Sequence, residues 1–213
     1  QTSTQNTIQG KIESVLSILY GHSIEINGSG RTDAGVHALG QIVNFHTSAT
    51  MSLQDMLQYM NQYLPEDIAV VEIDEVSERF HSRLNAKGKR YSYRVWNSSI
   101  PNVFWRRYAH TVEEKLDLEA MKSAASYLLG EHDFSAFCGN AKMKKSTVRK
   151  VDMIDISRKG DYIYFTYHGT GFLQHMIRIL TGTLLEVGFG KRSPENMQVI
   201  IDETARLNSL VND

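Results

Sequence analysis

The sequence has 213 residues, of which 41% are hydrophobic and 22% are charged, and its formal net charge is −1. These proportions are ordinary for a folded globular protein, and the small number of prolines argues against long extended linkers. No apolar run approaches the roughly 20 residues that cross a bilayer, and the first residues contain no basic segment followed by an apolar one. The single cysteine, Cys138, excludes an internal disulfide. We therefore expect an unexported cytoplasmic protein with no membrane partner.

The first 86 residues predict two helices and three strands. Apolar residues at helical spacing, followed by Gly21, predict a helix over 7–20. Ser52 with Asp55 three residues later is typical of a capping box and predicts a second helix that runs to Leu64. Strands are expected at 23–27, 39–47 and 68–76.

The residues from 87 onward repeat a similar order of elements. A strand is expected over 89–97, and a helix over 118–129 is capped by Asp117 and stopped by Gly130. Two alternating runs joined through Lys159-Gly160-Asp161 predict a hairpin. Its strands cover 147–157 and 162–167, a long amphipathic helix covers 172–187, and Ser193-Pro194 opens another helix. This order predicts an α+β protein with domains at 1–86 and 87–213.

The basic residues are concentrated in two stretches that contain no acid. Residues 79–112 hold eight Lys or Arg and no Asp or Glu, and residues 134–151 hold five more. Aromatic residues such as Tyr91, Trp96 and Trp105 are interleaved with the first stretch. This combination is typical of a nucleic-acid interface, where cations meet phosphates and rings stack on bases. Solvated strand edges would give the same charges, so charge alone leaves both interpretations open.

A small-residue loop from Gly28 to His37 carries a carboxylate, Asp33, in its middle. Three interpretations are open: a structural Asx turn, a phosphate-binding nest, or a pocket that presents Asp33 as nucleophile or base. The turn is the simplest of them, because Asp and Gly are common in turns. A Walker-type nucleotide loop is disfavoured, because the segment has no lysine and leads into a predicted strand.

The segment GRTDAGVHALGQ, residues 30–41, resembles the signature loop of the TruA family of tRNA pseudouridine synthases. The likeness continues in the family's order and covers nearly the whole chain. Its further segments are FHSR at 80–83, KRYSYR at 89–94, LGEHDF at 129–134 and FLQHMIR at 172–178. The resemblance implies an enzyme that isomerises uridine to pseudouridine on the 3′ side of the tRNA anticodon stem-loop. It further implies a homodimer that needs no cofactor. No metal is expected, because none of the histidines falls in an HExxH or a Cys-His spacing.

The resemblance also implies a role for each site residue. Asp33 would be the catalytic aspartate and Arg178 the arginine paired with it. Tyr91 would hold its ring against the target base. Substrate would also be bound by Arg31, which holds the nucleotide flipped out, and by Thr32 and His37. Taken singly, each residue also has a simpler interpretation. Tyr91 could be an ordinary residue of a sheet, and Arg178 could lie on the solvent-exposed face of a helix.

These roles suit the reaction, which breaks the bond from N1 to C1′, turns the uracil and rejoins it through C5. A duplex hides those atoms, so the nucleotide must be extruded and its lost stacking replaced. Asp33 must be ionised to act, and a neighbouring guanidinium favours the charged carboxylate. One carboxylate serves either attack at C6 of the base or assistance at the sugar, and the sequence leaves both routes open.

The fold implied by the resemblance consists of two ferredoxin-like halves. Their sheets would form one continuous, mainly antiparallel sheet with helices on one side and a central active-site cleft. Against the family pattern, we expect a first strand to be missing before Gln1 and a last strand to be missing at Asp213. Two other classes of protein remain as alternatives. One is a non-catalytic RNA-binding protein, and the other is a nucleotide-binding hydrolase that uses the loop from Gly28 to Gly35.

Overall fold

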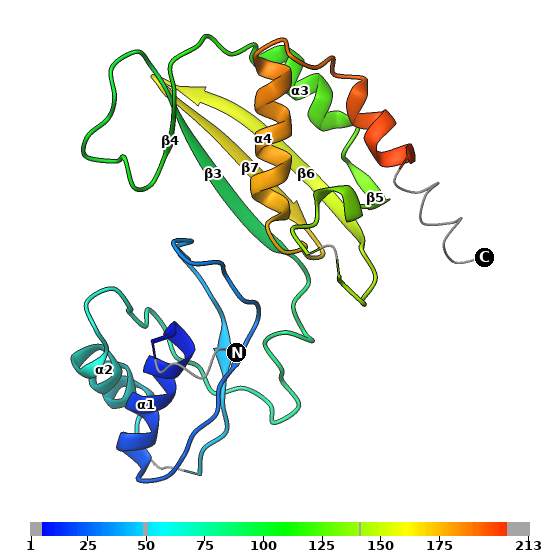
Figure 1. The fold of residues 1–213 in the computed structure, drawn as a ribbon. Coiled ribbons are helices and arrows are strands. Elements are labelled where there is room, and N and C mark those ends of the chain that lie inside the picture. The colour runs from blue at the N-terminus through cyan, green and yellow to red at the C-terminus, as the bar shows by residue number, and fades with distance from the viewer. Residues whose placement is uncertain (1–5, 49–50, 141, 204–213) are drawn as a thin grey trace. The chain divides into compact units, whose positions relative to one another are not determined.

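The computed structural model describes residues 6–48, 51–140 and 142–203 (Figure 1). The chain divides into two compact units, Gln1–Ala86 and Lys87–Asp213, here the N-terminal and the C-terminal unit. Both contain helices and strands around a core of their own, so the protein is α+β. The prediction that a first and a last strand are missing falls at the two ends of the chain. Residues 1–5 and 204–213 lie outside the described residues. Within the described ranges, no helix is long and apolar enough to cross a membrane.

Two helices form the core of the N-terminal unit, as predicted. Helix α1 (Ile8–Tyr20) starts where Thr7 Oγ1 accepts a hydrogen bond from Gly10 N at 3.0 Å, and it ends at Gly21 with a φ of 70°. Helix α2 (Leu53–Tyr63) starts at Ser52, whose Oγ accepts from Asp55 N at 3.1 Å. Their apolar faces share one cluster of buried residues, which comprises Ile12, Val15, Leu16, Ile24, Ile26, Met56, Met60 and Leu64.

The strands of this unit are much shorter than the sequence predicts. Only β1 (Asn27–Gly28) and β2 (Val43–Asn44) form a ladder among the described residues, and it is antiparallel. The rest of the predicted strands 23–27, 39–47 and 68–76 is not paired in a sheet. Leu39, the first residue of the predicted strand 39–47, is 96% exposed.

Helix side chains take the place of neighbouring strands in the N-terminal unit. Ile24 N donates to Ser17 Oγ at 2.9 Å, and Ile26 N donates to Glu13 Oε1 at 3.1 Å. On α2, the amide side chain of Asn61 bonds both the N–H and the carbonyl of residue 70 at 2.8 Å. These bonds satisfy backbone groups that a sheet would otherwise pair.

A five-stranded sheet organises the C-terminal unit, in the order β4-β3-β7-β6-β5. The strand predicted over 89–97 is confirmed, and so is the hairpin, which turns through Gly160 at a φ of 59°. Two short strands were not predicted, and one of them, β4, pairs in parallel with β3. The strands are β3 (Lys89–Asn97), β4 (His110–Val112), β5 (Gly130–Asp133), β6 (Val148–Lys159) and β7 (Tyr162–Gly169).

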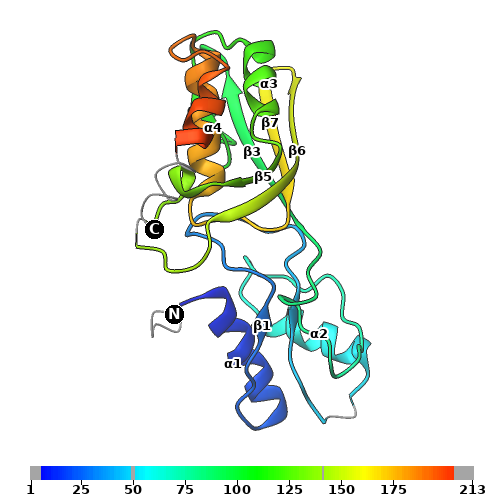
Figure 2. The same ribbon diagram turned by 90° about the vertical axis from the view of Figure 1, so that its right-hand side faces the viewer.

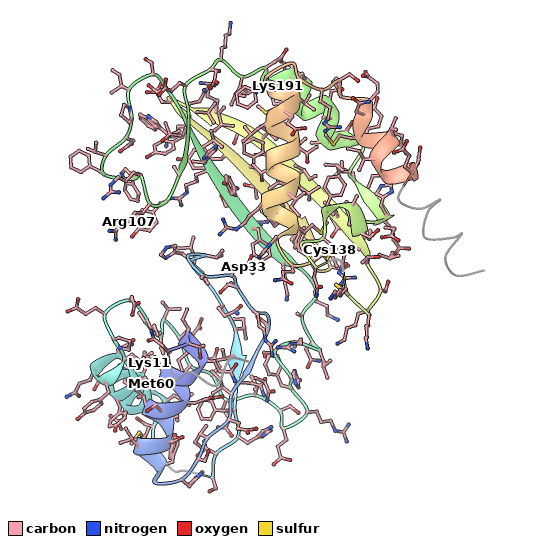
Figure 3. All side chains as sticks on the ribbon, in the orientation of Figure 1. Lys11, Asp33, Met60, Arg107, Cys138 and Lys191 are labelled. Atoms are coloured by element: carbon pink, nitrogen blue, oxygen red, sulfur yellow. The ribbon has the colours of Figure 1, made fainter. Side chains whose placement is uncertain are left out.

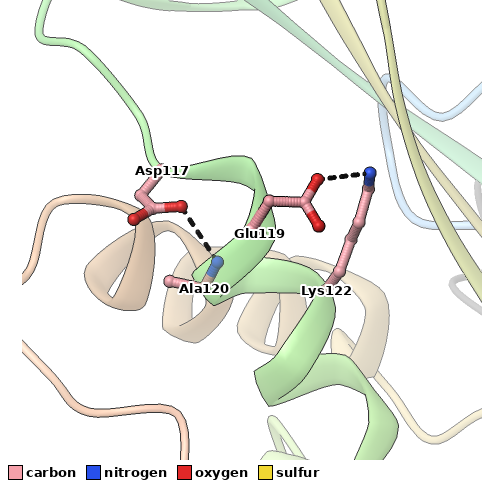
Figure 4. Close-up of polar contacts among 4 residues, drawn as sticks. All are labelled: Asp117, Glu119, Ala120 and Lys122. Atoms are coloured by element: carbon pink, nitrogen blue, oxygen red, sulfur yellow. Dashed lines mark hydrogen bonds and ion pairs between the residues drawn. The ribbon is translucent and has the colours of Figure 1, made fainter.

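Helices α3 (Leu118–Ser126) and α4 (Met176–Gly188) cover one face of this sheet (Figure 2). Every second residue of β7, beginning with Ile163, is buried toward them. Helix α3 begins as predicted at Asp117, whose carboxylate accepts from Ala120 N at 3.0 Å, and a Glu119–Lys122 pair at 2.8 Å follows (Figure 4). It ends at Ser126, before the predicted end at 129. Residues 196–203 are helical after Ser193-Pro194, as predicted.

A buried hydrogen bond joins the sheet to α4. Tyr167 Oη on β7 lies 2.8 Å from Thr181 Oγ1, and Thr181 Oγ1 itself donates to Ile177 O at 2.7 Å. The Tyr167 hydroxyl is therefore the donor of the first bond. Burial raises the pKa of Tyr167 well above its ordinary value, so this donor keeps its proton across the physiological range.

Replacing Thr181 with valine should leave the Tyr167 hydroxyl without its acceptor in the core. We expect Thr181→Val to lower the free energy of unfolding by about 1–3 kcal/mol. Tyr167→Phe in the same chain should recover part of that loss. Urea unfolding can be followed by tryptophan fluorescence, because Trp96 and Trp105 both lie in the C-terminal unit.

The matched control is Thr183→Val, on the same helix and half exposed. Its effect should stay within about 0.5 kcal/mol. Equal losses in the two valine variants would show that the bond to Tyr167 has no special weight.

Candidate active site

The loop that carries Asp33 is closed at its neck by hydrogen bonds. Ser29 N donates to Ile42 O at 2.9 Å and extends the β1–β2 ladder by one bond. Ser29 Oγ donates to Gln41 Oε1 at 2.9 Å, and Gln41 Nε2 donates to Gly30 O. Gln41 is the last residue of the signature-like segment, so that segment both forms the loop and closes it. The loop extends away from α1 and α2, and Figure 3 labels Asp33 on it.

A tight turn follows Asp33 directly. Val36 N donates to Asp33 O at 3.1 Å, and Gly35 has a φ of 78°. An L residue is strained at that φ, so the turn depends on glycine at this position. Arg31, Thr32 and His37 flank the turn and are exposed. Four of the predicted site residues thus lie together on one loop.

The base of the loop is anchored by a segment far away in the sequence. Ser82 N donates to Asn44 Oδ1 at 2.9 Å, and Ser82 Oγ donates to Asn27 O at 2.6 Å. Arg83 Nη2 adds a bond to Gly28 O at 3.3 Å. Asn44 and Ser82 are buried polar residues, at 8% and 3% exposure. The FHSR segment is recognisable in the sequence, but its anchoring role is not, because no local pattern links residues 38 positions apart.

Tyr91 lies on β3 of the C-terminal unit, opposite Tyr167 of β7. It is partly buried against the core on the helix-covered side of the sheet. Its ring meets the ring of Phe172 edge to face, with centroids 5.3 Å apart and planes at 82°. This geometry is one that aromatic pairs prefer, and it fixes the ring plane of Tyr91. In the sequence, Phe172 stands out as part of the FLQHMIR segment and of the predicted helix, but no local pattern reveals its contact with Tyr91.

Arg178 is exposed in the first turn of α4. The helix begins at Met176 rather than at the predicted 172, because His175 takes a left-handed conformation with a φ of 58°. Gly139 packs closely here: a Cβ on it would lie 2.6 Å from His175 Nδ1, and Gly139 N donates to Gln174 O at 2.8 Å. Strained residues of this kind persist where their surroundings enforce them, often at functional sites.

The predicted site residues are therefore divided between the units. Asp33, Arg31, Thr32 and His37 belong to the N-terminal unit, and Tyr91 and Arg178 belong to the C-terminal unit, whose α4 packs against β3. Across the described residues, no group of three or more His, Cys, Asp or Glu is arranged to hold a metal ion.

Comparison with known proteins identifies the family. A family described as tRNA pseudouridine synthase matches residues 1–85 and 124–211. A tRNA pseudouridine synthase A 2 of Bacillus cereus is 44% identical over 204 residues, which cover 96% of this chain and 83% of the relative. A tRNA pseudouridine synthase A of Bacillus sp. strain KSM-64 is 46% identical over 202 residues, covering 95% and 83%. The corresponding enzyme of Halalkalibacterium halodurans is 45% identical over 203 residues, covering 95% and 77%.

The chain belongs to the tRNA pseudouridine synthase family. The resemblance drawn from the sequence is thereby confirmed. The residues that match the family include the Asp33 loop and Arg178, so the family assignment rests on segments from both units.

The anchoring of the loop can be tested with Asn44→Ala. The change removes the acceptor of Ser82 N and should weaken the base of the Asp33 loop by about 1–3 kcal/mol. Hydrogen exchange should then speed up at Ser82 and at residues 27–36. Exchange in β6 and β7 serves as the internal control and should not change. Equal acceleration in both units would indicate general unfolding and would contradict a local anchor.

Proposed function

We propose that this protein isomerises uridine to pseudouridine on the 3′ side of the tRNA anticodon stem-loop. Family membership and the printed names of the relatives support this reaction. The observation that carries the proposal is the Asp33 loop itself. It is glycine-dependent at Gly35, closed at its neck by Gln41 and tied down by Ser82, which is more support than an ordinary surface turn requires.

Asp33 acts on the uridine as an ionised carboxylate. The glycosidic bond from N1 to C1′ breaks, the uracil turns, and a new bond forms between C5 and C1′. C5 then loses its proton to solvent and N1 gains one, so the reaction is balanced without an oxidant or a reductant. Asp33 either adds to C6 of the base or stabilises the sugar as uracil departs. Both routes need one carboxylate close to the nucleotide.

The remaining site residues bind and position the nucleotide. Tyr91, with its ring plane fixed by Phe172, stacks on the extruded uracil and replaces stacking lost from the RNA. Arg178 is the arginine that the family resemblance pairs with Asp33. Arg31, Thr32 and His37, all exposed beside Asp33, contact the flipped nucleotide and its phosphates.

The proposed enzyme has two domains and acts as a dimer. Each of the two domains, 1–86 and 87–213, has a ferredoxin-like α+β fold. Asp33, Tyr91 and Arg178 act on the same uridine. Two copies of the chain form a homodimer, and the enzyme works in the cytoplasm without a cofactor or a metal.

Substituting Asp33 with asparagine should abolish the reaction and leave tRNA affinity nearly unchanged, because the amide keeps the shape and loses the charge. The assay is release of tritium from C5 of labelled, unmodified tRNA without added metal or nucleotide. Asp67→Asn, an exposed acid of the same unit, is the matched control and should release tritium at the parent rate. Tritium release by Asp33→Asn would remove Asp33 from its role. No release from the parent, with tRNA bound, would favour a non-catalytic RNA-binding protein.

Changes at Tyr91 separate the ring from its hydroxyl. Tyr91→Ala should weaken both tRNA binding and turnover, since base stacking contributes about 1–3 kcal/mol per base. Tyr91→Phe keeps the ring and its contact with Phe172, so it should retain most of the affinity. Filter binding and single-turnover tritium release measure the two steps. Equal effects of alanine and phenylalanine would argue against stacking.

A further inference from the structure

The second face of the C-terminal sheet carries a row of aromatic and basic side chains. Side chains on β3 alternate between faces, so Tyr91 lies toward the helices and Arg94 and Trp96 lie on the other face. Arg94 is directly opposite Tyr164 in the ladder, and Trp96 is opposite Tyr162. These four residues define what we call the open face of the sheet. None of them takes part in the proposed reaction.

The loop over 98–109 forms a pocket on the open face. This aromatic pocket has a volume of about 280 Å³ and is lined by Arg94, Trp105, Tyr108, Ala109, Tyr162 and Tyr164. Its volume lies just below the roughly 300–1,000 Å³ of pockets for drug-sized ligands, so it suits a single planar group. Trp105 is 49% exposed and therefore has ring surface available for stacking.

Hydrogen bonds hold this loop on the sheet. Asn102 Nδ2 donates to Tyr162 Oη at 3.1 Å, and Asn102 Oδ1 accepts from Trp105 N at 3.2 Å. Tyr108 N donates to Trp105 O at 2.8 Å and closes the turn that carries both rings. The rings of Trp105 and Tyr108 are 5.8 Å apart. The pocket is thus built by specific contacts between the loop and β7.

The charge around the aromatic pocket favours an anionic partner. Arg94 lines it, Arg106 and Arg107 lie on the same loop, and residues 79–112 contain no acid. Figure 3 labels Arg107 on this loop. Among the ion pairs of the described residues, none involves Arg94. A larger hollow of about 650 Å³ at β4 is lined by Glu113 and Glu114 and would repel a phosphate.

We propose that the aromatic pocket binds an unpaired RNA base and its phosphate, from a part of the tRNA other than the reacting uridine. The base stacks on Trp105 or Tyr164, and Arg94 contacts the phosphate or a base oxygen. Aromatic rings with a neighbouring arginine are the usual means of binding single-stranded RNA without strong sequence preference. The proposal rests on the proposed function for the identity of the RNA as tRNA.

Fluorescence can report on this pocket directly, because the chain has only two tryptophans. Asp33→Asn with Trp96→Phe leaves Trp105 as the single tryptophan in a chain that binds without reacting. Titration with unmodified tRNA transcript should quench Trp105 emission with the same midpoint as binding measured by anisotropy of labelled tRNA. The companion chain, Asp33→Asn with Trp105→Phe, retains Trp96 and corrects for absorption by the RNA.

If the fluorescence emission of Trp105 stays constant while tRNA binds, the proposal is overturned. Because binding and tritium release are measured separately, this result leaves the proposed isomerisation untouched. Emission that changes with protein concentration in the absence of RNA would also overturn it, in favour of contact between two copies of the chain.

A second test removes one positively charged side chain from the aromatic pocket. Arg94→Gln should weaken tRNA binding about tenfold, the order expected for one lost arginine contact. The matched control is Lys122→Gln, which removes one positive charge from α3, on the opposite side of the sheet. Equal weakening by both variants would attribute the effect to net charge and would contradict a specific site.

Discussion

The antiparallel ladder between β3 and β7 determines what each face of the C-terminal unit presents. Tyr91 is paired with Tyr167 on the helix-covered face, and Arg94 is paired with Tyr164 on the open face. A shift of one residue would exchange the two faces, and burial of alternate β7 residues opposes that shift. The hydrogen bond from Tyr167 of β7 to Thr181 of α4 then holds this helix against the same strand. The positions of Tyr91 and Arg178 therefore depend on one register.

In the N-terminal unit, the loop that carries Asp33 is held mainly by side-chain hydrogen bonds. Its ladder contains two residues from each strand, too few to hold a long loop by themselves. Buried side-chain bonds through Asn44 and Ser82 supply the missing constraint, and Gln41 closes the neck. Polar networks of this kind specify a geometry only when every member is satisfied. The position of Asp33 thus depends on residues that carry no chemistry themselves.

Much of the fold follows from local signals, and the errors have a common cause. The caps at Ser52 and Asp117 and the strand over 89–97 are encoded by neighbouring residues, and each was predicted correctly. The segments 23–27 and 68–76 have strand alternation, but helix side chains bind their backbone, which alternation cannot reveal. The same limit applies to the site: the Asp33 loop is recognisable from its residues, whereas the Asn44–Ser82 bond is visible only in the folded unit.

The distribution of charge explains how a chain with a net charge of −1 can suit an RNA partner. In the C-terminal unit, Glu119, Asp152 and Glu186 each pair with a basic side chain of the same unit. The negative charges of these acids are partly neutralised by their ion-pair partners. Residues 87–112, in contrast, contain arginines and lysines without any acid between them. Because salt at physiological strength screens exposed charges beyond about 8 Å, a phosphate responds to the nearest side chains. Local grouping of charge, rather than the total, therefore decides whether RNA is attracted.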